Sequence, residues 1–290
     1  MTGQRKQIED AIPTLTEHVL ASREVPGDLI RYNCDPEFWK DKTTIGYMIS
    51  ADLAIKDVIR HLYCWQGSPV PPEIDTVRAF VDERKREALD VSLADCSSWH
   101  LYSVERYLFS LAAMELALDG VLNPELLEKF WDALEMQHKK ENRPIEWNAL
   151  FDPEAPANYV ICGLIGKILL GDGDTVIAFM DECSEERKVD IEVNDFDGQP
   201  YKVAYYTALR QMKHGDQKSA YHGQRTHASF HTWVWLTQWQ KDVPPCSFTQ
   251  MFMLWAAMRK VEGLPLDPQA ILQSFQPEPV CRLFLDSLPK

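Results

Sequence analysis

Carboxylates are the chemically active residues that this sequence concentrates most strongly in one place. Between Asp172 and Asp197 there are ten acidic residues and two basic residues, so this stretch accounts for −8 of the net charge of −14. A field of that sign repels phosphate backbones and attracts basic proteins. The stretch therefore disfavours nucleic-acid binding. It predicts either a binding surface for a basic protein partner or a solvated face that keeps the protein soluble.

The same carboxylates were considered as metal ligands. Asn194-Asp195-Phe196-Asp197-Gly198 has the acid spacing of a calcium loop, but aligning Gly198 with the obligatory glycine puts Val193 and Ala204 at the first and last ligand positions. The clusters at 181–186 and 194–195 loosely resemble the two Mg²⁺ motifs of class I terpene synthases. That family places its motifs on distant helices, whereas here they are about a dozen residues apart. Neither pattern predicts a metal site.

Histidines occur at spacings that resemble metal sites, but each set is incomplete. Glu135 and His138 form one Glu-x-x-His pair, whereas a di-iron bundle needs two, so His138 is interpreted as a cationic or donor group near a helix C-terminus. His227 and His231 have the i, i+4 spacing of a zinc-binding helix, but Ala228 stands where the catalytic glutamate would be. Nucleophile and phosphate-binding motifs are missing from the sequence. We therefore predict no catalytic, cofactor or metal site, with a dispersed enzyme site as the alternative.

A repeated helix-start pattern indicates how the chain positions these residues. An Asx side chain can cap free N–H groups, a proline fits the first helical position, and an acid stabilises the positive end of the helix dipole. The pattern and its variants occur at Asp35-Pro36-Glu37, Pro71-Pro72-Glu73, Asn123-Pro124-Glu125, Asp152-Pro153-Glu154 and Asp267-Pro268-Gln269. Gly171-Asp172-Gly173-Asp174 predicts a turn between two helices.

Apolar residues recur at helical spacing through most of the chain. The segment 98–119 has one long apolar stripe and is predicted to be a central, mostly buried helix. The only strand candidate is 191–198. The predicted fold class is all-α, an irregular multi-helix bundle or stacked helical hairpins of about a dozen helices, in one domain over 1–290 with any soft division near 183–200. The predicted helices lie near 4–21, 36–65, 72–90, 98–119, 124–140, 157–170, 174–188, 200–214, 226–241, 246–262, 268–275 and 278–288, with 36–65 either one long helix or two joined at Gly46.

Composition indicates the cellular compartment. The chain has 290 residues, 45% of them hydrophobic, which is enough for a continuous core. No apolar run approaches the roughly 20 residues of a membrane span, and the start of the chain does not resemble a signal peptide. The seven cysteines lie singly without a C-x-x-C pair, which is typical of a reducing cytoplasm. We expect a cytoplasmic protein that does not bind membranes.

Aromatic residues are densest at Phe230, Trp233, Trp235 and Trp239. Apolar residues at helical spacing are explained by helix packing alone, so core packing is the main interpretation. A tryptophan-lined groove that recognises a peptide is a third functional possibility, and it would change tryptophan fluorescence on ligand binding.

In organisation the whole chain resembles the all-α immunity proteins that bacteria encode beside polymorphic toxins. The resemblance rests on the segments Asp35–Trp65, Ser98–Asp119 and Gly198–His214 and on the acidic stretch 172–197. It implies stoichiometric, non-catalytic inhibition of a toxin with a basic surface. The residues expected to form the partner-binding surface are Asp181, Glu182, Glu185, Glu186, Asp190, Asp195 and Asp197. The alternative is an all-helical enzyme with a carboxylate and Mg²⁺ site for a small or nucleotide-derived substrate.

Overall fold

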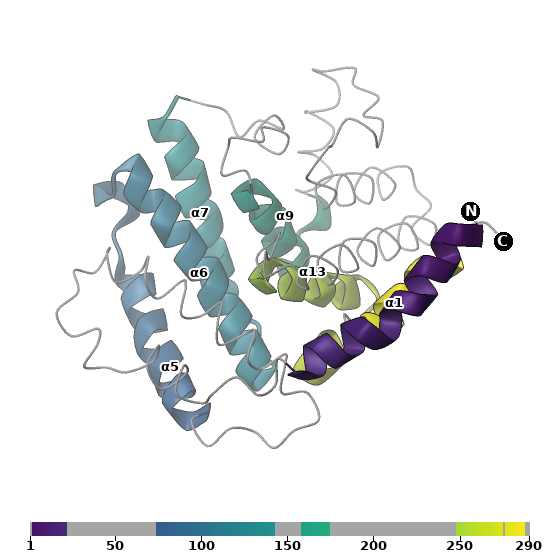
Figure 1. The fold of residues 1–290 in the computed structure, drawn as a ribbon. Helices are drawn as coiled ribbons and strands as arrows, with labels where there is room; N and C mark the ends of the chain where they lie inside the picture. Colours follow the sequence, from purple (N-terminus) through teal and green to yellow (C-terminus); the bar gives the residue numbers. More distant parts are fainter. Residues whose placement is uncertain (1, 22–73, 143–157, 175–247, 275, 288–290) are drawn as a thin grey trace.

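The computed structural model describes residues 2–21, 74–142, 158–174, 248–274 and 276–287. This part of the chain is all-α, with eight α-helices, one short 3₁₀ helix and no strand (Figure 1). The elements are α1 (Thr2–Ala21), α5 (Ile74–Asp90), η2 (Leu93–Asp95), α6 (Ser98–Asp119), α7 (Pro124–Lys140), α9 (Asn158–Leu170), α13 (Phe248–Val261), α14 (Pro268–Ser274) and α15 (Pro277–Ser287).

These helices confirm the all-α class and eight of the predicted segments. Each begins and ends within two residues of its prediction, and α6 and α7 match theirs at both ends. Apart from Asp174, the predicted helices at 36–65, 174–188, 200–214 and 226–241 lie outside the described residues. So do the strand candidate at 191–198 and the soft division near 183–200. The total of about a dozen helices stays a prediction.

Local capping explains why α7 and α14 begin where they do. The Asn123 side chain accepts a hydrogen bond from the Glu125 N–H at 3.1 Å, and Asp267 accepts one from the Gln269 N–H at 3.0 Å. In both cases the intervening proline is the first helical residue. The Asx-Pro interpretation is therefore confirmed at these two starts. The starts at 35, 71 and 152 lie outside the described residues.

The turn predicted at Gly171 is confirmed as the end of α9. Gly171 has φ +84°, a left-handed conformation that favours glycine. The Asp172 N–H donates to the Lys167 carbonyl at 2.9 Å, which is the bond of a Schellman motif. The chain is helical again at Gly173, so a single glycine turn ends the helix and redirects the chain.

Helix α6 lies at the centre of the described core. It packs against α5, α7, α9, α13 and α14, and Figure 1 shows it between α5 and α7. Its apolar stripe is buried as predicted, including Leu101, Val104, Leu108 and Leu111. The burial extends around the helix to Tyr107, so polar residues on this helix are also enclosed.

Helix α9 approaches α7 closely because Gly163 has no side chain. A Cβ atom at Gly163 would lie 2.9 Å from the Trp131 ring and 3.1 Å from a Leu134 methyl group. At the other end of the molecule α1 packs along α15, so the two terminal helices lie side by side (Figure 1). The described helices therefore form one packed assembly with α6 inside it.

The described cysteines belong to the core, as their isolated spacing predicts. Cys96, Cys162 and Cys281 are buried and form no disulfide. Burial raises the pKa of Cys281 to about 11, which makes its thiolate scarce at neutral pH. The other four cysteines lie outside the described residues. No helix within the described ranges is long and apolar enough to cross a membrane.

Candidate functional site

None of the acidic residues predicted to bind a partner lies among the residues that the structure describes. Asp181, Glu182, Glu185, Glu186, Asp190, Asp195 and Asp197 all lie outside the described residues. Of the stretch 172–197, the structure describes Asp172 and Asp174. Asp172 lies 3.4 Å from the Nζ atom of Lys167, on the last turn of α9. The beginning of the stretch is therefore paired in part with a basic side chain.

A second acidic surface lies on α7, which sequence reasoning did not single out. Four exposed carboxylates follow one another at spacings of three, four and three residues, which places them on one face of the helix. The opposite face of α7 is apolar and buried, with Phe130 and Leu134 in the core. We call this outward face the α7 acidic stripe. It consists of Glu125, Glu128, Asp132 and Glu135.

The carboxylates of the α7 acidic stripe make no ion pair with a described basic side chain. Glu135 accepts a hydrogen bond from the indole N–H of Trp131 at 2.6 Å, which leaves its charge in place. Lys139 ends the same face, and no ion pair joins it to Glu135. The stripe is thus a row of like charges open to solvent.

The other lysines of α7 are directed at backbone carbonyls. Lys129 Nζ donates to the carbonyls of Leu89 and Val91, the second at 2.7 Å. Lys140 Nζ donates to the carbonyls of Ala94, at 2.9 Å, and Cys96. Burial lowers the pKa of Lys129, and the nearby Asp90 charge opposes this effect. These lysines fasten the α5–α6 connection to α7.

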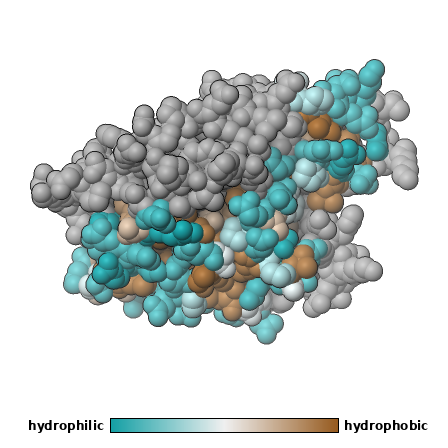
Figure 2. All heavy atoms as spheres, turned by 90° about the horizontal axis from the view of Figure 1, so that it is seen from below, coloured by the Kyte–Doolittle hydropathy of each residue, from teal (hydrophilic) through white to brown (hydrophobic). Residues whose placement is uncertain are grey.

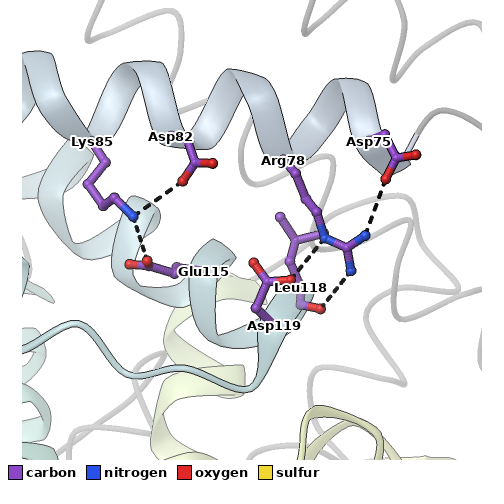
Figure 3. A network of polar contacts seen from close by, with 7 residues as sticks. All are labelled: Asp75, Arg78, Asp82, Lys85, Glu115, Leu118 and Asp119. Carbon is purple, nitrogen blue, oxygen red and sulfur yellow. Dashed lines mark hydrogen bonds and ion pairs between the residues drawn. The ribbon is translucent and has the colours of Figure 1, made fainter.

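The face shared by α5 and α6 is organised differently, as Figure 3 shows. Arg78 of α5 reaches Asp119 of α6 at 2.9 Å, and Lys85 of α5 reaches Glu115 of α6 at 2.6 Å. Each base also contacts an acid of its own helix: Asp75 lies 3.4 Å from Arg78 and Asp82 lies 3.3 Å from Lys85. Here acids and bases alternate and pair.

Glu105 of α6 is the acid that is fully buried among the described residues. Its side chain is 0% exposed, and neither carboxyl oxygen has a described hydrogen-bond partner. Burial, with a smaller effect from the negative charge of Glu141, raises the pKa of Glu105 well above its usual range. A carboxyl of this kind suits a general acid. However, a substrate could reach it only if the surrounding helices separated.

An exposed aromatic pair lies at the beginning of α6. Trp99 is 68% exposed and stacks on Tyr102, with ring centroids 6.0 Å apart and planes 18° from parallel. The helix start that positions it is capped by Ser97, whose side chain accepts the His100 N–H at 3.3 Å. The aromatic run that sequence analysis emphasised, 230–239, lies outside the described residues.

Of the incomplete metal patterns, only the Glu135–His138 pair lies among the described residues. Glu135 and His138 lie in the last two turns of α7, and His138 stands in its final turn with Lys139 and Lys140, as interpreted from sequence. Over the described ranges no three His, Cys, Asp or Glu side chains come together as metal ligands. His227, His231 and the calcium-loop candidate at 194–198 lie outside those ranges.

The surface of the described part is predominantly hydrophilic on the face shown in Figure 2, with separate hydrophobic areas between the polar side chains. Comparison of the chain with protein-family models, curated proteins and solved structures finds no match. The resemblance to immunity proteins therefore stays a prediction. The described features that could take part in function are the α7 acidic stripe, the Trp99–Tyr102 pair and Glu105.

Two of these features have a signal in the sequence. The acids at 125, 128, 132 and 135 keep a helical spacing that an inspection of charge along α7 would reveal. Glu105 lies four residues after Leu101 and three before Leu108, so it interrupts the apolar stripe of α6. The exposure of Trp99 has no such signal, because it depends on which neighbours pack against the start of α6.

Proposed function

We propose that this chain is a non-catalytic binding protein that neutralises a toxin with a basic surface by covering it with an acidic one. The observation that supports the proposal most directly is the α7 acidic stripe, whose carboxylates are exposed and form no ion pair with the described basic side chains, although the Asp132 charge acts on Lys129. In the proposal, the binding surface also includes Asp181, Glu182, Glu185, Glu186, Asp190, Asp195 and Asp197.

The energetics of α7 support a role for this stripe in binding. Like charges three or four residues apart on a helix destabilise it by about 0.2–0.5 kcal/mol per pair. The stripe contains three such neighbouring pairs, so the unbound protein retains an unfavourable interaction that a basic partner would relieve. A field of this kind also raises the association rate of an oppositely charged protein.

The Trp99–Tyr102 pair supplies a different kind of contact. Exposed tryptophans are frequent among the residues that dominate binding energy at protein interfaces. An indole face also attracts arginine and lysine side chains through cation–π interactions. A basic partner could therefore use both features, with the carboxylates increasing the association rate and the aromatic pair slowing dissociation.

The first experiment identifies the partner and tests neutralisation together. Tagged full-length protein is used to capture partners from its native cell, and each captured protein is expressed with and without this chain. We expect one captured basic protein to arrest growth alone and to be neutralised at one-to-one stoichiometry. Captured proteins whose toxicity is unchanged by the chain would contradict the proposal.

Charge reversal then tests the surface. One variant reverses residues 181, 182, 185 and 186 to lysine, and a second reverses Glu128 and Asp132 of the α7 acidic stripe. The matched control reverses Asp75 and Asp82 on the paired face. We expect the first two variants to slow association and flatten its salt dependence, and the control to change neither. Unchanged binding in both acidic variants would exclude this surface.

The enzyme alternative has a separate test. A carboxylate site that uses Mg²⁺ should bind the ion with a defined stoichiometry, whereas scattered surface acids bind it weakly. Calorimetric titration of the full chain with Mg²⁺ and Ca²⁺ distinguishes the two cases. Tight, saturable uptake would favour the enzyme and contradict the proposal of a non-catalytic inhibitor.

A further inference from the structure

Glu105 is a carboxyl group enclosed at the contact between α6 and the helices around it. It lies about two turns into α6, its side chain is 0% exposed, and neither oxygen accepts a hydrogen bond from a described group. Moving an ionised carboxylate into such surroundings without a partner is strongly unfavourable, so a buried acid of this kind retains its proton. The packed state is therefore suited to the neutral acid.

The charged groups of the neighbouring helices do not compensate Glu105. The charge that acts on it from α7 is Glu141, an acid at the end of that helix, which opposes ionisation further. Helix α14 has no charged residue. Among the basic side chains of α5, α9 and α13, most are bound elsewhere and Lys260 is exposed: Arg78 binds Asp119, Arg84 binds Glu83 and Glu87, Lys85 binds Glu115, Arg86 binds the Asp82 carbonyl, Lys167 binds Asp172, and Arg259 binds the Pro265 carbonyl. On α7, Lys129 and Lys140 bind backbone carbonyls and Lys139 is exposed. Neither His100 nor Arg106, which lie on α6 itself, offsets the effect of Glu141 on the Glu105 carboxyl.

We propose that Glu105 is a pH-sensitive lock on the contact between the first half of α6 and the C-terminal end of α7. The packed arrangement holds the neutral acid, and transfer of its proton to solvent separates the two segments so that water hydrates the carboxylate. The Lys140 bonds to the Ala94 and Cys96 carbonyls are among the contacts that loosen. This inference does not depend on the proposed partner.

The sign of the pH dependence follows from the raised pKa. In the unfolded chain a glutamate releases its proton near pH 4.3, whereas in the folded chain Glu105 releases it at higher pH. Stability is therefore highest below the unfolded pKa and falls as pH rises towards the folded pKa. Within that window each pH unit lowers the folding equilibrium constant tenfold relative to a chain without this carboxyl.

The test compares urea unfolding of the full chain from about pH 4 to about pH 8, spanning the ordinary glutamate pKa. The variants are Glu105→Gln, the matched exposed control Glu128→Gln, and Glu141→Gln. We expect the ratio of wild-type to Glu105→Gln unfolding constants to grow tenfold per pH unit in the window, while Glu128→Gln parallels wild type. Glu141→Gln should narrow the window by lowering its upper end, because it removes a charge that raises the folded pKa of Glu105. Parallel curves for wild type and Glu105→Gln would overturn the proposal.

Two further measurements keep the test decisive if Glu105→Gln does not fold. Glu105→Met then replaces it, because methionine is apolar and of similar length. Infrared spectroscopy of wild type within the window above the ordinary glutamate pKa should show the C=O band of a protonated carboxylic acid, and Glu105→Met should lack it. Hydrogen exchange, corrected for its intrinsic pH dependence, should accelerate at 98–105 and 134–141 more than in α5 as pH rises. Absence of the band, or uniform exchange, would overturn the proposal.

Discussion

On α5, two basic side chains reach across to acids of α6, whereas on α7 the acids face solvent and two lysines reach backbone carbonyls. Arg78 and Lys85 bind Asp119 and Glu115, so charge on that face helps to join two helices (Figure 3). The α7 acidic stripe joins nothing among the described residues. Acidic and basic residues therefore join two helices on one face and leave carboxylates exposed on the other.

On α7, the residues that stabilise the helix and the residues that carry its negative charge lie on opposite faces. Helix α7 is held by its apolar face, which packs on α6 and α9, and by the lysine contacts with the 89–96 segment. Its carboxylates make no described ion pair, and like-charge pairs on a helix are destabilising. Removing an inward residue and removing an outward one should therefore have very different effects.

Phe130→Ala should produce the largest change. Phe130 is fully buried and lies against Phe109 of α6, with ring centroids 5.6 Å apart. Losing the ring leaves a cavity and should lower the free energy of unfolding by about 3–5 kcal/mol, as measured by urea denaturation. The outward control Asp132→Ala should change it by less than about 0.5 kcal/mol. Similar losses for both variants would break the distinction between the two faces of α7.

Glu115→Gln should have an intermediate effect, because it removes the charged partner of Lys85. The two side chains are 13% and 21% exposed, so the pair is only partly screened by water. We expect a loss of about 1.5–3 kcal/mol at neutral pH. Asp82→Asn is the matched control, since Asp82 is 69% exposed and lies 3.3 Å from Lys85; it should lose less than about 1 kcal/mol.

The pH dependence of this pair has a definite sign. The hydrogen bond to Glu115 is the largest factor that raises the pKa of Lys85. Its stabilisation is therefore fully present below the unfolded lysine pKa of about 10.4 and is lost as pH rises through the higher folded value. Urea denaturation of wild type and Lys85→Met should differ by a constant amount near neutral pH and converge above that value. A difference independent of pH throughout would show that the ion pair contributes nothing.

Features set by local residues could be predicted from the sequence, whereas contacts between distant positions could not. Helices α6 and α7 were predicted at both ends because their limits depend on local residues such as Asn123 and Pro124. The pairing of Arg78 with Asp119 joins positions 41 residues apart, so it depends on how α5 packs on α6. The contacts of Lys129 could not be predicted for the same reason, because its acceptors are the Leu89 and Val91 carbonyls at the end of α5 and just after it.

The candidate site was predictable to a smaller extent. The stretch 172–197 has a large net negative charge, which is visible in the sequence. Helix α7 does not, because its lysines bring its net charge close to neutral. The helical spacing of the four acids is visible in the sequence, but the binding of Lys129 and Lys140 to backbone carbonyls is not. Glu105 interrupts an apolar stripe, which is visible in the sequence, but its lack of a partner depends on every helix that surrounds α6.

Glu128→Lys should have the smallest effect and the opposite sign. It replaces repulsion from Glu125 and Asp132 with attraction to both, and i, i+3 and i, i+4 pairs contribute about 0.2–0.5 kcal/mol each. We expect urea denaturation at low salt to show a gain of up to about 2 kcal/mol, since both pairs change sign, shrinking as salt screens the exposed charges. Glu128→Gln, which removes repulsion without adding attraction, should give an intermediate value. A loss of stability in Glu128→Lys would mean that Glu128 has a favourable partner within the chain, and the α7 acidic stripe would then be a structural surface like that of α5 and α6.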